Sequence, residues 1–148
     1  MKIAQLQLNK YSVTEYSYKL NLSPKKAKES TYEIEVDFDV KGHKTDPDKY
    51  LMIMTINLNK RPVFFKSNRY KIFMRLLGEF GFAKGMEREI KTRLIFNNGS
   101  AMLYGVARGA VAQFTGGLGA ERFILPAVNL LDVVKEKAKK FSSAPKTK

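Results

Sequence analysis

The segment from Gly99 to Gly117, GSAMLYGVARGAVAQFTGG, predicts a helix of about four turns with almost no charge. Its one charged residue is Arg108, and nearly all the other positions are small or apolar. A helix that is apolar all round must be covered on more than one side. In a chain of 148 residues with one patterned sheet, a second copy of the protein is expected to supply the other cover. The segment therefore predicts an oligomer.

The composition is that of a single soluble domain. Hydrophobic residues make up 44% of the chain and charged residues 28%, which is enough to bury a core. We expect one domain over residues 1–141 and a disordered basic tail over residues 142–148. There is no uncharged apolar run of about 18 residues, and the first ten residues do not resemble a secretion signal. A cytoplasmic protein without membrane insertion is expected.

The residue types exclude most catalytic and metal-site chemistry. The chain has no cysteine, and its single histidine, His43, lies in a turn-like run. Disulfides, thiolate zinc sites and cysteine nucleophiles are therefore excluded, and no pair of general base and nucleophile stands out. We interpret the chain as a non-enzyme without metal or cofactor. An enzyme with an unrecognised carboxylate site remains an alternative.

The first half of the chain predicts four β-strands. A loose alternation over Ile3–Leu22 indicates the first strand, and Tyr32–Val40 alternates apolar and acidic residues in the clearest period-two pattern. Tyr50–Leu58 is apolar on both sides, as in a central strand. Val63–Phe65 and Tyr70–Leu77 indicate a fourth strand with a break. Four consecutive strands with short turns predict an antiparallel meander.

The second half predicts three helices. Glycines between residues 78 and 85 end the strands, and apolar residues recur every four positions over Met86–Leu94, as in a short helix. Asn97–Ser100 offers an N-cap for the long helix, and Pro126 suits the first position of a C-terminal helix. The glycine groups lack the spacing of phosphate-binding loops, so we interpret them as marking the ends of strands and helices. The order of elements predicts an α+β domain: a four-stranded antiparallel β-meander followed by a short helix, a long interface helix and a C-terminal helix.

Two features of the predicted elements allow a structural and a functional interpretation. Acidic residues alternate along the second strand at Glu33, Glu35, Asp37 and Asp39, where they form a row rather than surround one ion. A solvated outer face is favoured over a cation site. On the long helix, Arg108 is favoured as a structural hydrogen-bonding or ion-pairing residue over a catalytic one.

Two glycines one turn apart, Gly105 and Gly109, remove side chains from one edge of the long helix. Such an edge allows another helix to approach closely. Packing between subunits is favoured over packing on the protein's own sheet. The expected subunit interface lies at Leu103, Tyr104, Gly105, Arg108, Gly109 and Ala112.

The charge is strongly positive and uneven. Twenty-seven Lys and Arg against fourteen Asp and Glu give +13, and the stretch from Lys60 to Gly78 contains six basic residues and no acid. Aromatic residues at Phe64, Phe65, Tyr70 and Phe73 interleave with these cations, as in sheets that bind single-stranded nucleic acid. A solvated surface or a docking face for an acidic partner is the other interpretation. A basic α+β protein that binds RNA or single-stranded nucleic acid is the alternative function.

The order of elements and three sequence stretches resemble the export chaperone SecB family. GEFGFAKGMEREIK resembles the exit of its fourth strand into its short helix, MLYGVARGAVAQFTGG its long helix, and LPAVNLLDVV the opening of its last helix. The resemblance spans Gln5 to Phe141. It departs at Gly105, which replaces a proline of the long helix, and at Pro126, which is shifted by one position. The chain is similar to a divergent, basic member of the family.

The resemblance implies an ATP-independent holdase, assembled as a homotetramer by dimerisation of dimers. Its clients would be unfolded or nascent preproteins, or an antitoxin that the chaperone guards. The family docks on the SecA motor through sheet carboxylates, whereas Lys19 and Arg75 lie near those positions here and argue against that mode. The implied peptide-binding groove contains Ile34, Val36, Phe38, Phe123, Leu125, Val128 and Leu131; the alternative is that these residues form the core.

Overall fold

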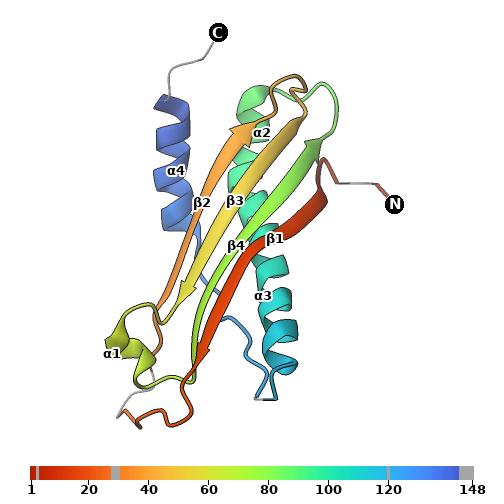
Figure 1. Ribbon diagram of the computed structural model, residues 1–148. Helices are drawn as coiled ribbons and strands as arrows, with labels where there is room; N and C mark the ends of the chain where they lie inside the picture. Colours follow the sequence, from red (N-terminus) through yellow and green to blue (C-terminus); the bar gives the residue numbers. More distant parts are fainter. Residues whose placement is uncertain (3, 28–30, 120, 144–148) are drawn as a thin grey trace.

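The computed structural model describes residues 1–2, 4–27, 31–119 and 121–143, without the side chains of 141–143. Its strands are β1 (Leu6–Leu20), β2 (Ile34–Gly42), β3 (Lys49–Leu58) and β4 (Tyr70–Phe82). Its helices are α1 (Pro62–Phe65), α2 (Arg88–Leu94), the π-helix η1 (Ile95–Gly99), α3 (Ser100–Gly116) and α4 (Leu131–Ser143). The α+β class predicted from the sequence is confirmed, with a four-stranded antiparallel sheet followed by helices (Figure 1). Of the tail expected over residues 142–148, residues 142 and 143 belong to α4, and residues 144–148 lie outside the described part of the chain.

The strand order differs from a simple meander. The sheet runs β1-β4-β3-β2, so β2, β3 and β4 form the expected meander while β1 pairs with β4 instead of β2. β1 and β4 pair from Leu6↔Phe82 to Leu20↔Tyr70, with two bulges. The prediction of a four-stranded meander is therefore wrong in the place of β1. The acidic strand β2 is left at the other edge, a position that favours charged side chains.

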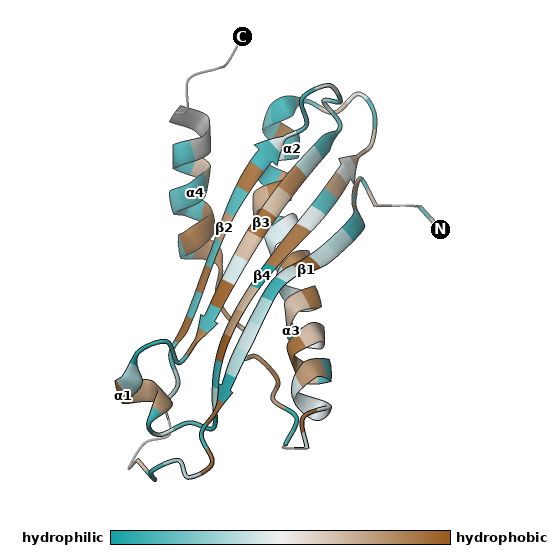
Figure 2. Cartoon of the chain, viewed as in Figure 1, coloured by the Kyte–Doolittle hydropathy of each residue, from teal (hydrophilic) through white to brown (hydrophobic). Residues whose placement is uncertain are grey.

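One face of the sheet holds the core. Every second residue of β3 and β4 is buried there; α3 lies across this face, and α4 stands beside its β2 edge (Figure 1). Figure 2 shows apolar colour along much of β3 and β4. The opposite face, which we call the outer face, carries the acidic row of β2 and has no helix of the described chain over it.

The fourth strand begins and ends later than predicted. Val63–Phe65 lies in α1, a short helix with Pro62 at its start, because proline fixes a helical φ at that position. β4 then continues through Gly78 and Gly81 to Phe82 instead of ending at Leu77. A Cβ at Gly78 would lie 3.2 Å from Leu103 of α3. The glycine thus permits close packing of helix on strand rather than ending the strand.

The helices also differ from the expected boundaries. α2, η1 and α3 follow one another without a break, so the N-cap predicted at Asn97–Ser100 is wrong. Ser100 is buried and its hydroxyl donates to the Phe96 carbonyl at 2.6 Å, within the helical run. The long helix itself is confirmed at Ser100–Gly116. In the described parts of the chain, no helix has the length and apolar character needed to cross a membrane.

Candidate functional site

The segment that joins α3 to α4, residues 121–130, is held on α3 by three side chains; we call it the crossover. The Arg108 Nε donates to the Leu125 carbonyl at 2.8 Å, and the Tyr104 hydroxyl donates to the Pro126 carbonyl at 2.5 Å. The Thr115 hydroxyl accepts the Phe123 amide N–H at 2.8 Å. Arg108 therefore has the structural hydrogen-bonding role expected from the sequence.

These bonds hold the crossover in an extended conformation, so the last helix begins later in the sequence than predicted. α4 begins at Leu131 rather than at Pro126, and the Asn129 side chain accepts the Leu131 amide N–H at 3.1 Å. The prediction that Pro126 opens the helix is therefore wrong. Burial raises the pKa of the Tyr104 hydroxyl, while the charge of Arg108 opposes that shift. The neutral hydroxyl is thus kept as a donor to the crossover.

An aromatic cavity of about 200 Å³ opens where the crossover meets the start of β2. Phe123 lines it, with the Tyr32 ring edge-on to the Phe123 ring at 6.4 Å and the Tyr70 ring at 5.8 Å from it. Arg69 and Arg122 line it together with these rings. Edge-to-face rings give a firm apolar surface that accepts side chains of many shapes.

The ring of Tyr70 is fixed by its own hydroxyl, which donates to the Glu121 carbonyl at 2.8 Å. Beneath it the buried Asn59 side chain donates to the Tyr70 carbonyl at 2.8 Å and accepts the Glu33 amide N–H at 3.0 Å. The aromatic cavity is therefore preorganised, because backbone atoms from the residue before β2, from β4 and from the crossover are bonded around it.

A second cavity of about 200 Å³ lies farther along β2, against α4, and is lined by Phe38, Val40 and Phe96. Its rim contains Lys137, whose ammonium group lies 2.9 Å from Asp37 and 3.4 Å from Asp39. The hydrogen bond to Asp37 raises the pKa of Lys137, against an opposing effect of partial burial. The acidic row of β2 thus fastens α4 to the sheet edge.

The implied groove residues divide by burial. Ile34, Val36, Phe123 and Val128 are half-buried and Leu131 is exposed. Phe38 and Leu125 are fully buried, so they support the surface from beneath. Sequence reasoning did not assign three further residues of this region to the groove, although Tyr32 starts the alternating strand and Tyr70 is among the aromatic residues interleaved with the basic run. The three are Tyr32, Tyr70 and Ile124.

We call the accessible part of this region the β2 groove. It comprises Tyr32, Ile34, Val36, Phe123, Ile124, Val128 and Leu131.

The expected interface residues divide in the same way. Leu103 and Tyr104 are buried in the chain's own core, and Arg108 is engaged with the crossover. Gly105 and Gly109 face away from the sheet, since a Cβ at either would meet no atom within 4 Å. The alternative that these glycines pack on the protein's own sheet is therefore excluded.

Exposed apolar residues and glycines lie on two sides of α3, one of which contacts β1. Phe114 of α3 stacks on Tyr16 of β1, with ring centroids 4.5 Å apart. The Tyr16 hydroxyl is buried without a hydrogen-bond partner among the described residues, and burial raises its pKa. We call this region the α3–β1 surface. Its exposed members are Tyr11, Tyr18, Ala101, Met102, Gly105, Gly109 and Phe114.

Comparison with known proteins gives a fold and a distant relative. No family model matches the chain. An uncharacterised protein of Methanocaldococcus jannaschii is 25% identical over 127 residues, which are 84% of this chain and 79% of that protein. The structure is similar to the Mycobacterium tuberculosis SecB-like chaperone solved with a peptide of the HigA1 antitoxin. That likeness has a TM-score of 0.61 at 17% identity and covers 84% of this chain and 91% of the other.

A further solved structure, a protein of unknown function from Streptococcus agalactiae, has a TM-score of 0.49 at 14% identity and covers 82% of this chain. The SecB-like fold expected from the sequence is confirmed by the mycobacterial structure.

Proposed function

We propose that the chain is an ATP-independent holdase of the SecB type, which binds unfolded polypeptides in the β2 groove. One observation carries the proposal. Ile124 and Leu131 are 58% and 54% exposed, in the crossover and at the start of α4, and Phe123 of the same crossover lines an aromatic cavity that is already formed. Large apolar side chains gathered on a surface mark a binding site.

The groove suits unfolded chains better than one defined ligand. Its contacts are aromatic rings and aliphatic side chains, which accept many side chains without selecting a sequence. Arg69 and Arg122 at the rim add hydrogen-bond donors for backbone carbonyls or acidic side chains of a client. The clients would be unfolded preproteins or an antitoxin segment, in keeping with the peptide bound by the mycobacterial SecB-like structure.

The same proposal includes self-association through the α3–β1 surface, as a dimer of dimers in the cytoplasm. That surface has no charged residue among its exposed members. It contains exposed tyrosines, Met102 and two glycines that are open to solvent. A second copy would cover it and remove it from water. Docking on a SecA-type motor is not part of the proposal, because Lys19 and Arg75 stand on the outer face.

The experiment is suppression of aggregation of a denatured globular protein, followed by light scattering without nucleotide. The groove variant is Ile124→Ser with Leu131→Ser. The matched control is Leu22→Ser with Val63→Ser, because those residues are 76% and 68% exposed outside the groove. We expect client affinity to fall about tenfold in the groove variant, from two lost apolar contacts, and to stay unchanged in the control. Equal activity of both variants would contradict the proposal.

A further inference from the structure

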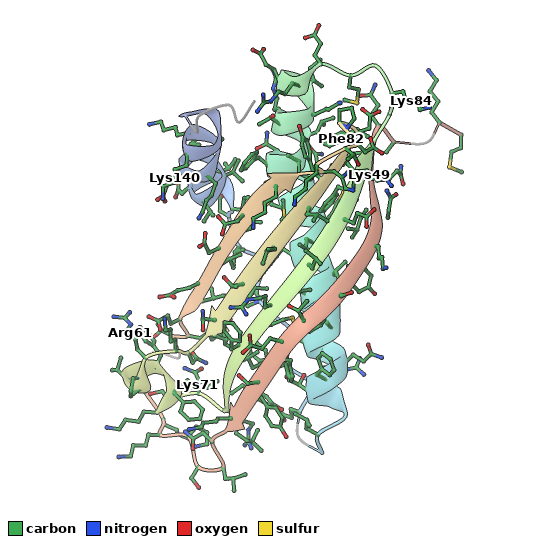
Figure 3. The ribbon with its side chains drawn as sticks, turned by 45° about the horizontal axis from the view of Figure 1, so that its top comes forward. Lys49, Arg61, Lys71, Phe82, Lys84 and Lys140 are labelled. Atoms are coloured by element: carbon green, nitrogen blue, oxygen red, sulfur yellow. The ribbon has the colours of Figure 1, made fainter. Side chains whose placement is uncertain are left out.

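A cavity of about 280 Å³ lies on the outer face of the sheet, at the end beside α1. Three lysines line it, from three different segments: Lys19 from β1, Lys71 from β4, and Lys60 from the loop after β3. Figure 3 labels Lys71 near this end of the sheet. The aromatic cavity and the α3–β1 surface use the opposite face, so this site is separate from the β2 groove.

The lysines form a concentration of positive charge that the chain does not neutralise. Lys19 and Lys71 are directly opposite each other in the β1–β4 register. Like charges in directly opposed positions destabilise a sheet. No ion pair among the described residues involves Lys19, Lys71 or Lys60. The folded chain therefore carries an unfavourable interaction that a bound anion would relieve.

Two nearby carboxylates are already engaged, whereas Glu35, opposite Asn57 in the β2–β3 register, has no ion pair among the described residues. Glu15 accepts from Arg75 at 2.8 Å, and Glu33 is bound by Arg61. Both acids are thus bound by arginine, whose planar guanidinium group matches the geometry of a carboxylate. The three lysines have no such partner in the described part of the chain, and each ammonium group acts as a separate point charge. A phosphate, with its negative charge on several oxygens, suits a cluster of ammonium groups.

An aromatic ring lies next to the charges. Phe73 lines the cavity two residues beyond Lys71 on β4, is half-buried, and projects on the outer face. The Arg75 guanidinium carbon is 5.5 Å from the centre of that ring. Alternating cations and an outward ring on an uncovered sheet are the elements with which sheets bind single-stranded nucleic acid.

The positive charge extends past the cavity. The Lys25 amide N–H donates to the Lys66 carbonyl at 3.0 Å, so the segment after β1 lies against α1. Lys25, Lys26 and Lys66 are all exposed in this region. The site is therefore suited to a long polyanion rather than to one small anion.

We propose that the outer face binds single-stranded nucleic acid, with a backbone phosphate among Lys19, Lys60 and Lys71 and a base against Phe73. This binding does not depend on the holdase activity, since it uses the other face of the sheet.

The test measures fluorescence anisotropy of a labelled oligo(dT) of about 12 nucleotides, across salt concentration. The site variant replaces Lys19, Lys60 and Lys71 by glutamine. The matched control replaces Lys84, Lys135 and Lys139 by glutamine. These lysines are exposed away from the cavity, and the control variant loses the same amount of positive charge as the site variant. We expect the site variant to bind at least tenfold more weakly at low salt, with a salt slope reduced by about two. The control variant is expected to lose less than twofold.

The Phe73→Leu variant tests whether a base packs against the Phe73 ring. The substitution should weaken the binding of oligo(dT) severalfold. It should not change the binding of an abasic strand of the same length, because that strand has no base to stack on the ring. Equal losses in the site and control variants would overturn the proposal in favour of diffuse charge attraction. Binding of poly-glutamate as tight as that of oligo(dT), unaffected by Phe73→Leu, would overturn it in favour of an acidic polypeptide.

Discussion

Arg108 and Leu125 are joined by a hydrogen bond of 2.8 Å from the guanidinium Nε to the backbone carbonyl. The bond links the middle of α3 to the crossover, whose two ends carry the aromatic cavity and the start of α4. Because Leu125 is fully buried beside it, the position of the crossover is set from within the core. The geometry of the β2 groove therefore depends on the interior of the domain.

Arg108→Ala is expected to destabilise the domain and to loosen the crossover. It leaves the Leu125 carbonyl without its donor in a partly buried place, at a cost of about 1–3 kcal/mol in the free energy of unfolding. Urea denaturation measures the loss, and hydrogen exchange should accelerate over residues 121–130. Arg93→Ala, at an exposed position of α2, is the control. Exchange that rises uniformly over the chain would contradict a local role.

Gly105→Glu is expected to separate the subunits without unfolding them. A side chain at Gly105 meets no atom of its own chain within 4 Å, and replacing a helical glycine stabilises a helix by up to about 1 kcal/mol. Across a subunit interface, however, the same side chain would place a charge where two helices approach. Light scattering should give a mass of about four chains for the wild type, as in a dimer of dimers, and a smaller mass for the variant.

Ser23→Glu is the control for the added charge, because Ser23 is exposed in the loop after β1. A mass that Gly105→Glu leaves unchanged, in a folded protein, would mean that the α3–β1 surface is not the interface.

The strands and the long helix could be predicted because their signals are local. The alternation over Tyr32–Val40 indicates a half-buried strand whatever its partner. The place of β1 could not be predicted in this way, since its alternation is equally compatible with pairing to β2 or to β4. The start of α4 was missed for a similar reason. Pro126 and Asn129 are both good start signals, and bonds from α3 to the crossover decide between them.

The candidate site could be predicted only in outline. The sequence shows that Ile34, Val36 and Phe38 share one face of a strand. It does not show that α4 and η1 cover Phe38 and leave the other two half-exposed, because that depends on where the last helix docks. The aromatic cavity combines residues far apart in the chain, such as Tyr32 and Phe123. No local pattern connects them.

Lys91→Ala is expected to cost more stability than other lysine substitutions. The Lys91 ammonium group is buried, lies 2.7 Å from Asp48, and donates to the Pro47 carbonyl at 2.9 Å. Removing it leaves Asp48 without its counter-ion, at a cost of about 2–4 kcal/mol because that carboxylate keeps some contact with water. Urea denaturation of Lys91→Ala against Lys84→Ala, an exposed control, measures the difference. A loss equal to that of the control would show that the pair is neutral to folding.

The attachment of α4 is expected to weaken at alkaline pH. The hydrogen bond to Asp37 raises the pKa of folded Lys137 above its ordinary value of 10.5. A raised pKa means that the charged form is favoured in the folded state, so its contribution is complete below pH 10.5 and is lost as the pH rises through the folded pKa. Lys137→Gln should therefore be less stable than the wild type at neutral pH, and the difference should shrink as the pH rises through the folded pKa of Lys137.

The buried hydroxyls of Tyr16 and Tyr104 also have raised pKa values and also destabilise the fold at high pH. They are present in both proteins, so their effect cancels in the difference between wild type and Lys137→Gln. Free energies of unfolding from urea titrations at several pH values give that difference directly. Lys139→Gln, at an exposed position of α4, should differ from the wild type by the same amount at every pH. If Lys137→Gln behaved like Lys139→Gln, the acidic row of β2 would not fasten α4.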